Sequence, residues 1–259
     1  AHFDEATYPA GDPNALMTPQ IGFNEVTRVP GPNLCGLLAD LGWPLGFGCV
    51  ESINDDFTTI AEARGQVNGG EVTVQGTVSR AFGAFARIQD NSGPDGASGL
   101  TIRQTSGSLS NSFQQDIADG TIRPGTVLRV TSFVSSFNGL VQLNNDDVTS
   151  YEVVAQADPP AAASVSLNEL AENGGDYESE LVTVSSPLTL TDAGGNTFQS
   201  SSTYTVENSS GDALTFRVQG GDQSNLGGTP LPEGSFFYTG VVGVFADDIQ
   251  LIPVRESDL

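Results

Sequence analysis

Apolar and polar positions alternate along much of the chain after residue 70, and this period of two is typical of half-buried β-strands. In the stretch EVTVQGTV (71–78), Val72 and Val74 alternate with Thr73 and Gln75. Short apolar-periodic stretches at 58–65 and 166–175 predict two short helices. The pattern therefore predicts a chain built mainly from strands, with few and short helices.

Two segments of the chain follow the same order of elements and read as copies of one another. Each has a short helix, an alternating strand, two strands around an acidic turn, and a long strand pair that follows a Pro and a Gly. Leu143 and Leu251, which lie 108 positions apart, are predicted to correspond. The same alignment pairs Gly125 with Gly234 and Arg103 with Arg217.

The long strand pair of the first copy carries a strong hairpin signal. Asn138-Gly139 favours a two-residue type I′ turn, and Asp247-Asp248 is expected at the equivalent turn of the second copy. Val127 and Phe133 are expected on the inward face of this hairpin. About five strands for each copy, with many glycines, favour an all-β fold of two tandem OB-like five-stranded barrels. An immunoglobulin-like sandwich, which needs about seven strands, is the alternative.

Composition divides the chain into four parts. Residues 1–50 are rich in Pro and Gly and form a predicted irregular N-terminal arm. Residues 51–156 form the first predicted β domain, residues 164–259 form the second, and residues 157–163 between them form a linker. Pro159-Pro160 in this linker blocks both helix formation and ladder pairing.

The charge of the chain is strongly one-sided, with 32 Asp and Glu against nine Lys and Arg and a net charge of −23. All nine basic residues are Arg. Such a chain repels phosphate backbones and anionic membrane surfaces, so neither nucleic acid nor a membrane is an expected partner. No apolar run is long enough to cross a membrane. An acidic chain rich in Gly, Ser, Thr and Asn, with one predicted disulfide, is expected to be secreted or to lie at a cell surface.

Acidic turns raise the question of metal binding. Asp90, Asn91 and Asp95 form the best candidate calcium site, because calcium takes carboxylate and amide oxygens on loops. Solvated turn residues are the alternative reading. No other cofactor is expected.

Three further positions carry possible covalent chemistry. Cys35 and Cys49 are the only cysteines, and they predict one disulfide in an oxidising compartment, with two buried thiols as the alternative. Asn208 begins an N-x-S sequon and is a weak glycosylation candidate.

The two copies resemble the OB-like accessory domains found in large secreted bacterial proteins. The first copy carries this resemblance at 60–64, 72–78, 88–90, 124–130 and 139–143. It implies a module without chemistry of its own. OB-like barrels bind oligonucleotides or oligosaccharides, and the acidic charge favours a glycan or a protein. Most of the aromatic side chains in the two copies are expected in the barrel cores.

The N-terminal arm resembles the end of a leishmanolysin-like zinc metalloprotease domain. The resemblance lies in His2 to Glu5, in Asn14 to Pro19, and in Leu37 to Trp43. It implies His2 as a third zinc ligand and Met17 as the methionine below the metal. The HExxH helix, which supplies two ligands and the general base, does not occur in this sequence. The chain as given is therefore expected not to be an enzyme, and to be a mature form, a fragment, or the end of a longer precursor.

An arm without the rest of such a domain keeps many large apolar side chains that need burial. They are expected to pack on their own barrel, on a missing protease half, or on a neighbouring copy as a self-association arm. The residues proposed for that contact are Leu16, Met17, Ile21, Phe23, Leu37, Leu38, Leu41 and Trp43.

These expectations converge on an extracellular, non-catalytic structural or interaction protein. A self-assembling fibre or surface subunit, with the N-terminal arm as the contact between subunits, is the form expected of it. A C-terminal accessory region of a secreted zinc metalloprotease is the alternative. A glycan-binding module is the second alternative.

Overall fold

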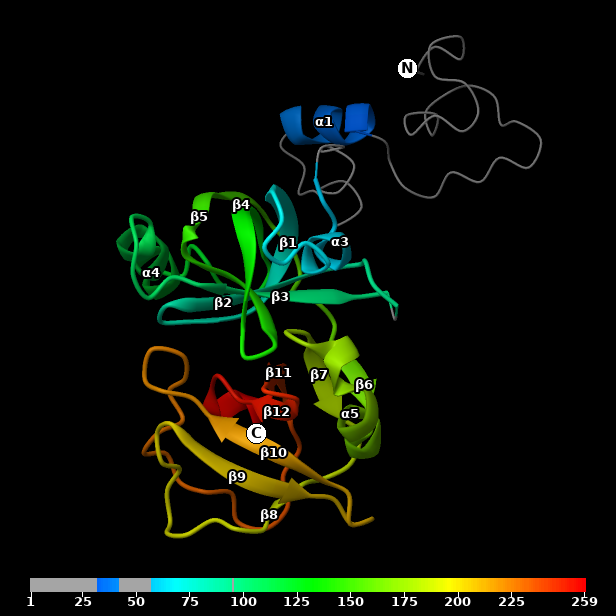
Figure 1. Cartoon of the computed structure of the whole chain (residues 1–259), viewed down its shortest axis with the longest axis vertical. Coiled ribbons are helices and arrows are strands. Elements are labelled where there is room, and N and C mark those ends of the chain that lie inside the picture. Colours follow the sequence, from blue (N-terminus) through cyan, green and yellow to red (C-terminus); the bar gives the residue numbers. More distant parts are fainter. Residues whose placement is uncertain (1–31, 42–56, 95) are drawn as a thin grey trace, which may run out of the picture. The chain divides into compact units, whose positions relative to one another are not determined.

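A computed structural model describes residues 32–41, 57–94 and 96–259 of the chain. It divides into two compact units, residues 1–57 and residues 58–259. Within the first unit the described residues include helix α1 (Pro32–Asp40). The second unit is mostly β and contains a first β domain, residues 58–156, and a second β domain, residues 163–259 (Figure 1).

The first β domain is a closed barrel of five strands in the order β1-β2-β3-β5-β4. All neighbours in it pair antiparallel except β3 and β5, which run parallel. Its helices are α3 (Ile60–Arg64) and α4 (Ser110–Ala118), and its strands are β1 (Glu71–Phe82), β2 (Phe85–Asp90), β3 (Ser98–Arg103), β4 (Thr126–Phe137) and β5 (Leu140–Gln156).

The barrel closes because β1 is long enough to pair with both β2 and β4. The strand bends where its register shifts between Val78 and Arg80. Gly76 lies at the crowded inner side, where an added Cβ would lie 3.0 Å from Cδ1 of Ile60 and 3.1 Å from the Gln89 carbonyl oxygen. The predicted alternation in 71–78 is confirmed, since Val72 and Val74 are buried and Thr73 and Gln75 are half-buried.

The predicted hairpin is also confirmed, but one of its inward positions is wrong. Asn138 and Gly139 have φ of 48° and 89°, as a type I′ turn requires. The buried positions of β4 alternate without interruption from Leu128 to Val134, which places Phe133 on the outer face of the strand. Ser132 is therefore buried, whereas Phe133 is 45% exposed.

Short helices close the ends of this barrel. Helix α3 was predicted, and it begins with a capping box in which Thr59 and Glu62 exchange hydrogen bonds. Its Ile60 and Ala63 are fully buried in the barrel core. Helix α4 lies between β3 and β4 and contributes the buried Phe113 to the same core.

The second β domain is a seven-stranded sheet in the order β6-β7-β11-β12-β10-β9-β8. Residues 157–162 connect it to β5. It contains β6 (Ala163–Val165), α5 (Leu167–Asn173), the 3-10 helix η2 (Gly174–Tyr177), β7 (Leu181–Val184), β8 (Thr189–Leu190), β9 (Ser202–Glu207), β10 (Ala213–Val218), β11 (Thr239–Phe245), β12 (Asp248–Ile252) and the 3-10 helix η3 (Glu256–Asp258).

This sheet corrects the prediction of a second five-stranded barrel, and Pro187 accounts for much of the difference. Proline has no N–H for a ladder, and here the segment that corresponds to β1 is divided into β7 and β8 on either side of Pro187. β7 pairs with β11 as β1 pairs with β4, and β8 pairs with β9 as β1 pairs with β2. The short strand β6 adds to β7 as the seventh strand.

The register of the strands bears out the predicted repeat. Leu143 lies opposite Ile102, the residue before Arg103, in the parallel pair β3–β5. Leu251 lies opposite Phe216, the residue before Arg217, in the parallel pair β10–β12. The turn of the second hairpin is displaced by one residue from its predicted position, because Ala246 and Asp247 carry the positive φ angles.

The two β domains approach each other closely at Gly99 of β3. A Cβ added to Gly99 would lie 2.4 Å from the Ser179 carbonyl carbon and 2.7 Å from the Glu180 nitrogen. Backbone atoms of this kind have little freedom to move away. The absence of a side chain at Gly99 therefore sets the spacing of the two domains.

We predict that Gly99→Ala lowers the free energy of unfolding by about 2 kcal/mol or more, because the added methyl group forces two backbones apart. Gly70→Ala is the control, since a Cβ at Gly70 meets nothing within 4 Å. The control should change stability by less than about 0.5 kcal/mol. Urea denaturation of both variants measures the difference, and equal stabilities would contradict this account of the spacing.

Candidate functional site

A cleft of about 450 Å³ lies between the two β domains. We call it the inter-domain cleft. Both domains contribute side chains to its wall, mainly aromatic rings, glutamine amides and two guanidinium groups. The lining residues are Phe85, Arg103, Phe137, Leu140, Gln142, Thr203, Arg217, Gln219, Gln223, Val244, Phe245, Gln250 and Ile252.

Much of this wall consists of equivalent positions of the two repeats. Phe85 lies opposite Arg103 in the pair β2–β3, and Thr203 lies opposite Arg217 in the pair β9–β10. The residue before Leu143 is Gln142, and the residue before Leu251 is Gln250. Phe137 and Phe245 both end the strand before the hairpin turn. The cleft is therefore formed by the same face of each repeat, with the two faces turned toward each other.

The two arginines of the cleft are held by neutral oxygen atoms. Nη1 of Arg103 donates to Oδ1 of Asn144 at 2.8 Å, and Nη1 of Arg217 donates to Oγ1 of Thr203 at 3.0 Å. The guanidinium of Arg103 also lies 6.0 Å from the centre of the Phe85 ring. In the described ranges neither arginine forms an ion pair, and the cleft lining contains no Asp or Glu. The charged side chains that line the cleft are therefore positive, although the protein as a whole is strongly negative.

The glutamines of the cleft offer amide groups to its interior. Gln142 is only 5% exposed, and no hydrogen bond from the described part of the chain engages its side-chain amide. Gln250 is 8% exposed, and its Nε2 donates to Oδ2 of Asp248 at 3.0 Å. Gln142 lines the cleft, so its amide is available to donate to and accept from a ligand there.

Two phenylalanines at the hairpin ends are exposed, contrary to the expectation that most aromatic rings lie in the cores. Phe137 is 59% exposed and Phe245 is 49% exposed, and their ring centres lie 6.4 Å apart at 61°. Phe85 and Tyr238 are buried as expected. The exposed rings belong to the cleft because each one ends a strand at a hairpin turn that projects toward the other domain.

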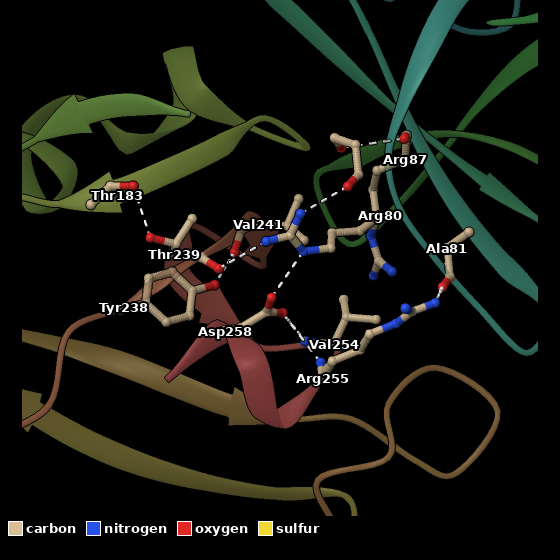
Figure 2. Close-up of polar contacts among 11 residues, drawn as sticks. Arg80, Ala81, Arg87, Thr183, Tyr238, Thr239, Val241, Val254, Arg255 and Asp258 are labelled. Carbon is tan, nitrogen blue, oxygen red and sulfur yellow. Dashed lines mark hydrogen bonds and ion pairs between the residues drawn. The ribbon is translucent and has the colours of Figure 1, made fainter. Parts of the chain in front are cut away.

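A buried ion pair joins the two domains beside the cleft, and Figure 2 shows its polar neighbours. Nε of Arg80 on β1 donates to Oδ1 of Asp258 at 2.9 Å, and the side chains are 15% and 1% exposed. Nη2 of Arg80 donates to the Thr239 carbonyl oxygen at 3.1 Å. Oδ2 of Asp258 accepts hydrogen bonds from the backbone nitrogens of Val254 and Arg255. Both carboxylate oxygens of Asp258 therefore accept hydrogen bonds. A buried charge is stable only when it is paired and hydrogen-bonded in this way.

A second ion pair fixes the opposite side of the same interface. Nη1 of Arg64 lies 3.1 Å from Oε1 of Glu178, and it also donates to the Gly99 carbonyl oxygen at 2.9 Å. The same Oε1 accepts a hydrogen bond from the Val141 nitrogen. Oε1 of Gln89 accepts from the Leu181 nitrogen at 2.9 Å. These contacts involve α3, β2, β3 and β5 of the first domain, so they fix the relative orientation of the domains.

Arg87 and Tyr238 lie buried near Asp258 in this interface. Burial lowers the pKa of the Arg87 guanidinium from its ordinary value to about 10, and the nearby Tyr238 and Asp258 oppose this shift. The guanidinium lies 5.8 Å from the centre of the Phe85 ring. Burial also raises the pKa of Tyr238 well above its ordinary value, with a further increase from Asp258, and its hydroxyl donates to the Val241 carbonyl oxygen at 2.8 Å. Both groups therefore keep their neutral-pH protonation in the interface.

Of the predicted calcium site, Asp90 makes hydrogen bonds within the protein. Oδ2 of Asp90 accepts from the Ile60 nitrogen at 2.7 Å at the start of α3, and Oδ1 accepts from the nitrogen and hydroxyl of Ser92. Asn91 is exposed, and Asp95 lies outside the described residues. Within the described ranges, no three His, Cys, Asp or Glu side chains lie together as metal ligands would. Calcium binding stays a prediction.

Some of the other predicted positions lie within the described residues and some lie outside them. Nδ2 of Asn208 donates to Oδ2 of Asp212 at 2.8 Å in the turn between β9 and β10. Cys35 is buried in α1, while Cys49 lies outside the described residues, so their disulfide stays a prediction. The remaining predicted residues outside the described ranges are His2, Leu16, Met17, Ile21, Phe23 and Trp43.

Three residues of the predicted self-association arm are described. Leu37 is 48% exposed, Leu41 is 63% exposed, and Leu38 is half-buried. Leu37 and Leu41 are four residues apart and thus lie on one side of the helix and its end. This pair is an exposed apolar stripe on α1.

Comparison of the chain with models of protein families found no match. Comparison with curated proteins found no match either. Among the residues that the structure describes, no helix has both the length and the apolar character needed to cross a membrane.

We predict that Asp258→Asn lowers the free energy of unfolding by about 3 kcal/mol or more, since it leaves Arg80 buried without its counter-charge. Glu152→Gln is the control, because Glu152 pairs with Arg129 at 3.0 Å but is 63% exposed. The control should cost about 1 kcal/mol or less. Chemical denaturation measures both values, and a loss at Asp258 no larger than at Glu152 would show that the buried pair does not hold the domains.

Proposed function

We propose that the protein is a non-catalytic, extracellular binding protein in which two OB-like β domains hold a glycan between them. The inter-domain cleft carries this proposal, because equivalent faces of both repeats supply its arginines, amides and exposed rings. A cleft of this size, with apolar walls and a few polar groups, is typical of small-ligand sites.

The strand order supports the OB-like interpretation of both domains. An OB-fold is a five-stranded, partly open Greek-key barrel that binds ligands on its second and third strands and on the loops after strands one and four. Phe85 follows the turn after β1, and Phe137 precedes the turn after β4. Thr203 and Phe245 hold the matching places in the second domain, if β7 and β8 are counted as one broken strand. These positions support a cleft that uses the ligand face of an OB-like domain in each copy.

A glycan suits these side chains better than a nucleic acid does. Single-stranded nucleic acid requires a basic groove along several phosphates, and the chain has a net charge of −23. Sugar hydroxyls both donate and accept hydrogen bonds, as the amides of the cleft glutamines do. The exposed faces of Phe137 and Phe245 offer apolar contact to the C–H groups of a sugar ring.

Binding to a panel of neutral and acidic oligosaccharides tests this proposal. We predict that Phe137→Ala and Phe245→Ala each weaken binding by about tenfold or more, since they remove a central contact. Phe237→Ala is the control, because Phe237 is 62% exposed and does not line the cleft. The bound oligosaccharide should be recovered at its original length. Cleavage of the oligosaccharide, or equal losses in all three variants, would contradict the proposal.

Self-assembly through the N-terminal arm is a second proposed function, supported by the exposed pair Leu37 and Leu41. We predict that the full chain sediments as oligomers or filaments, and that Leu37→Ser with Leu41→Ser shifts it toward monomer because the apolar stripe is lost. Leu140→Ser in the cleft is the control. A full chain that is monomeric at all concentrations in sedimentation and negative-stain imaging would contradict self-assembly.

The resemblance to a leishmanolysin-like protease supports a third proposed role, as the accessory region of such an enzyme. As the accessory region of such an enzyme, the two β domains would hold it on a glycan surface through the same cleft. The residues that carry this resemblance lie mainly outside the described ranges. An upstream HExxH segment in the full gene product would support this role.

A further inference from the structure

We infer that the inter-domain cleft selects short oligosaccharides that carry carboxylate groups, with Arg103 and Arg217 each binding a carboxylate. This inference rests on the proposed glycan-binding function and adds the chemistry of the ligand. It concerns the cleft as a joint site of two domains, in which each domain supplies one arginine.

The first argument is the unused hydrogen-bonding capacity of the two guanidinium groups. Each presents five N–H donors, and the described residues engage one nitrogen of each, Nη1, with a neutral oxygen. Three other arginines of the protein, in contrast, form ion pairs with Asp or Glu. In a chain with 32 carboxylates, two half-buried arginines that face a cleft without any are matched to an anion from outside.

The second argument is the equivalent placement of the two arginines. Arg103 comes directly after Ile102, which pairs with Leu143 between β3 and β5. Arg217 comes directly after Phe216, which pairs with Leu251 between β10 and β12. The two repeats therefore each supply one arginine, at equivalent positions, to the same cleft. A ligand with a carboxylate on each of two adjoining units uses both arginines, whereas a ligand with one charge uses only one.

The amides of the cleft distinguish an acidic sugar from a simple inorganic anion. Gln142 is 5% exposed with no hydrogen bond to its side-chain amide in the described part of the chain, and Gln219 and Gln223 likewise have unengaged amides. Each amide offers an acceptor oxygen as well as two donors. Phosphate and sulfate chiefly accept hydrogen bonds, so they leave the amide oxygens unsatisfied. Sugar hydroxyls satisfy both kinds of group.

The size and charge of the protein limit the ligand to a short one. The cleft holds about 450 Å³, which is within the usual range for a small-ligand site. Outside the cleft the net charge of −23 repels a long polyanion. A disaccharide or trisaccharide of uronic acid units therefore fits better than a charged polymer.

Isothermal titration of the full chain with digalacturonate tests this inference, with its dimethyl ester as the neutral counterpart. We expect Arg103→Gln and Arg217→Gln each to weaken binding by about tenfold or more, because each removes a charge-assisted pair. Arg103→Lys should restore part of the affinity, since it keeps the charge without the fork. Arg123→Gln is the matched control, because Arg123 is exposed and lies outside the cleft lining.

The outcomes separate this inference from the proposed function. Digalacturonate binding that exceeds binding of the ester by about tenfold, and that only the cleft variants reduce, supports the inference. Equal binding of ester and acid, or equal losses in Arg123→Gln, overturns the acidic specificity but leaves a neutral glycan site. Inorganic phosphate that binds as tightly as digalacturonate also overturns it. Thermal unfolding of each variant confirms that it is folded, and Arg217→Lys replaces any variant that is not.

Discussion

The buried ion pairs between the two β domains are the constraint on which the rest of the structure depends. Arg80 with Asp258 and Arg64 with Glu178 connect the barrel to the second sheet at separate points, and Gly99 allows the two backbones to meet between them. Charges in such places are stable only with complete sets of hydrogen bonds, which require one relative orientation. That orientation brings the equivalent faces of the repeats together and creates the cleft. Domain orientation and ligand site are therefore one structural property.

Much of the fold followed from local signals. The alternation in 71–78, the helix over 60–64 and the turn at Asn138-Gly139 are set by neighbours in the sequence, and the structure confirms them. Departures arose at two places: Phe133 lies on the outer face of β4, and Pro187 divides the first strand of the second domain. Val127 and Phe133 were predicted on one face, but Val127 lies before the register shift between Val127 and Leu128, and Phe133 lies after it. A two-residue periodicity does not record such a shift. Pro187 could have predicted the division of this strand from the sequence, because proline has no N–H to donate to a neighbouring strand.

The site itself was only partly accessible from the sequence. The repeat alignment paired Arg103 with Arg217, but that correspondence does not reveal that the two residues line the same cleft. Their meeting depends on tertiary contacts such as the one between Gln89 and Leu181, which are 92 residues apart. The exposed rings of Phe137 and Phe245 resembled core residues because burial of an aromatic ring is the common case. The one signal in the sequence that pointed to the site was the pair of equivalent arginines, Arg103 and Arg217, in a chain with few basic residues.

Residual dipolar couplings of the isotopically labelled protein test the central claim, that the two β domains are held as one body, most directly. The account predicts that the couplings from residues 58–156 and from residues 163–259 fit the structure with a single alignment tensor of the same magnitude and orientation. Two tensors that differ in magnitude or direction would show that the domains move independently. In that case the cleft would not persist as a binding site.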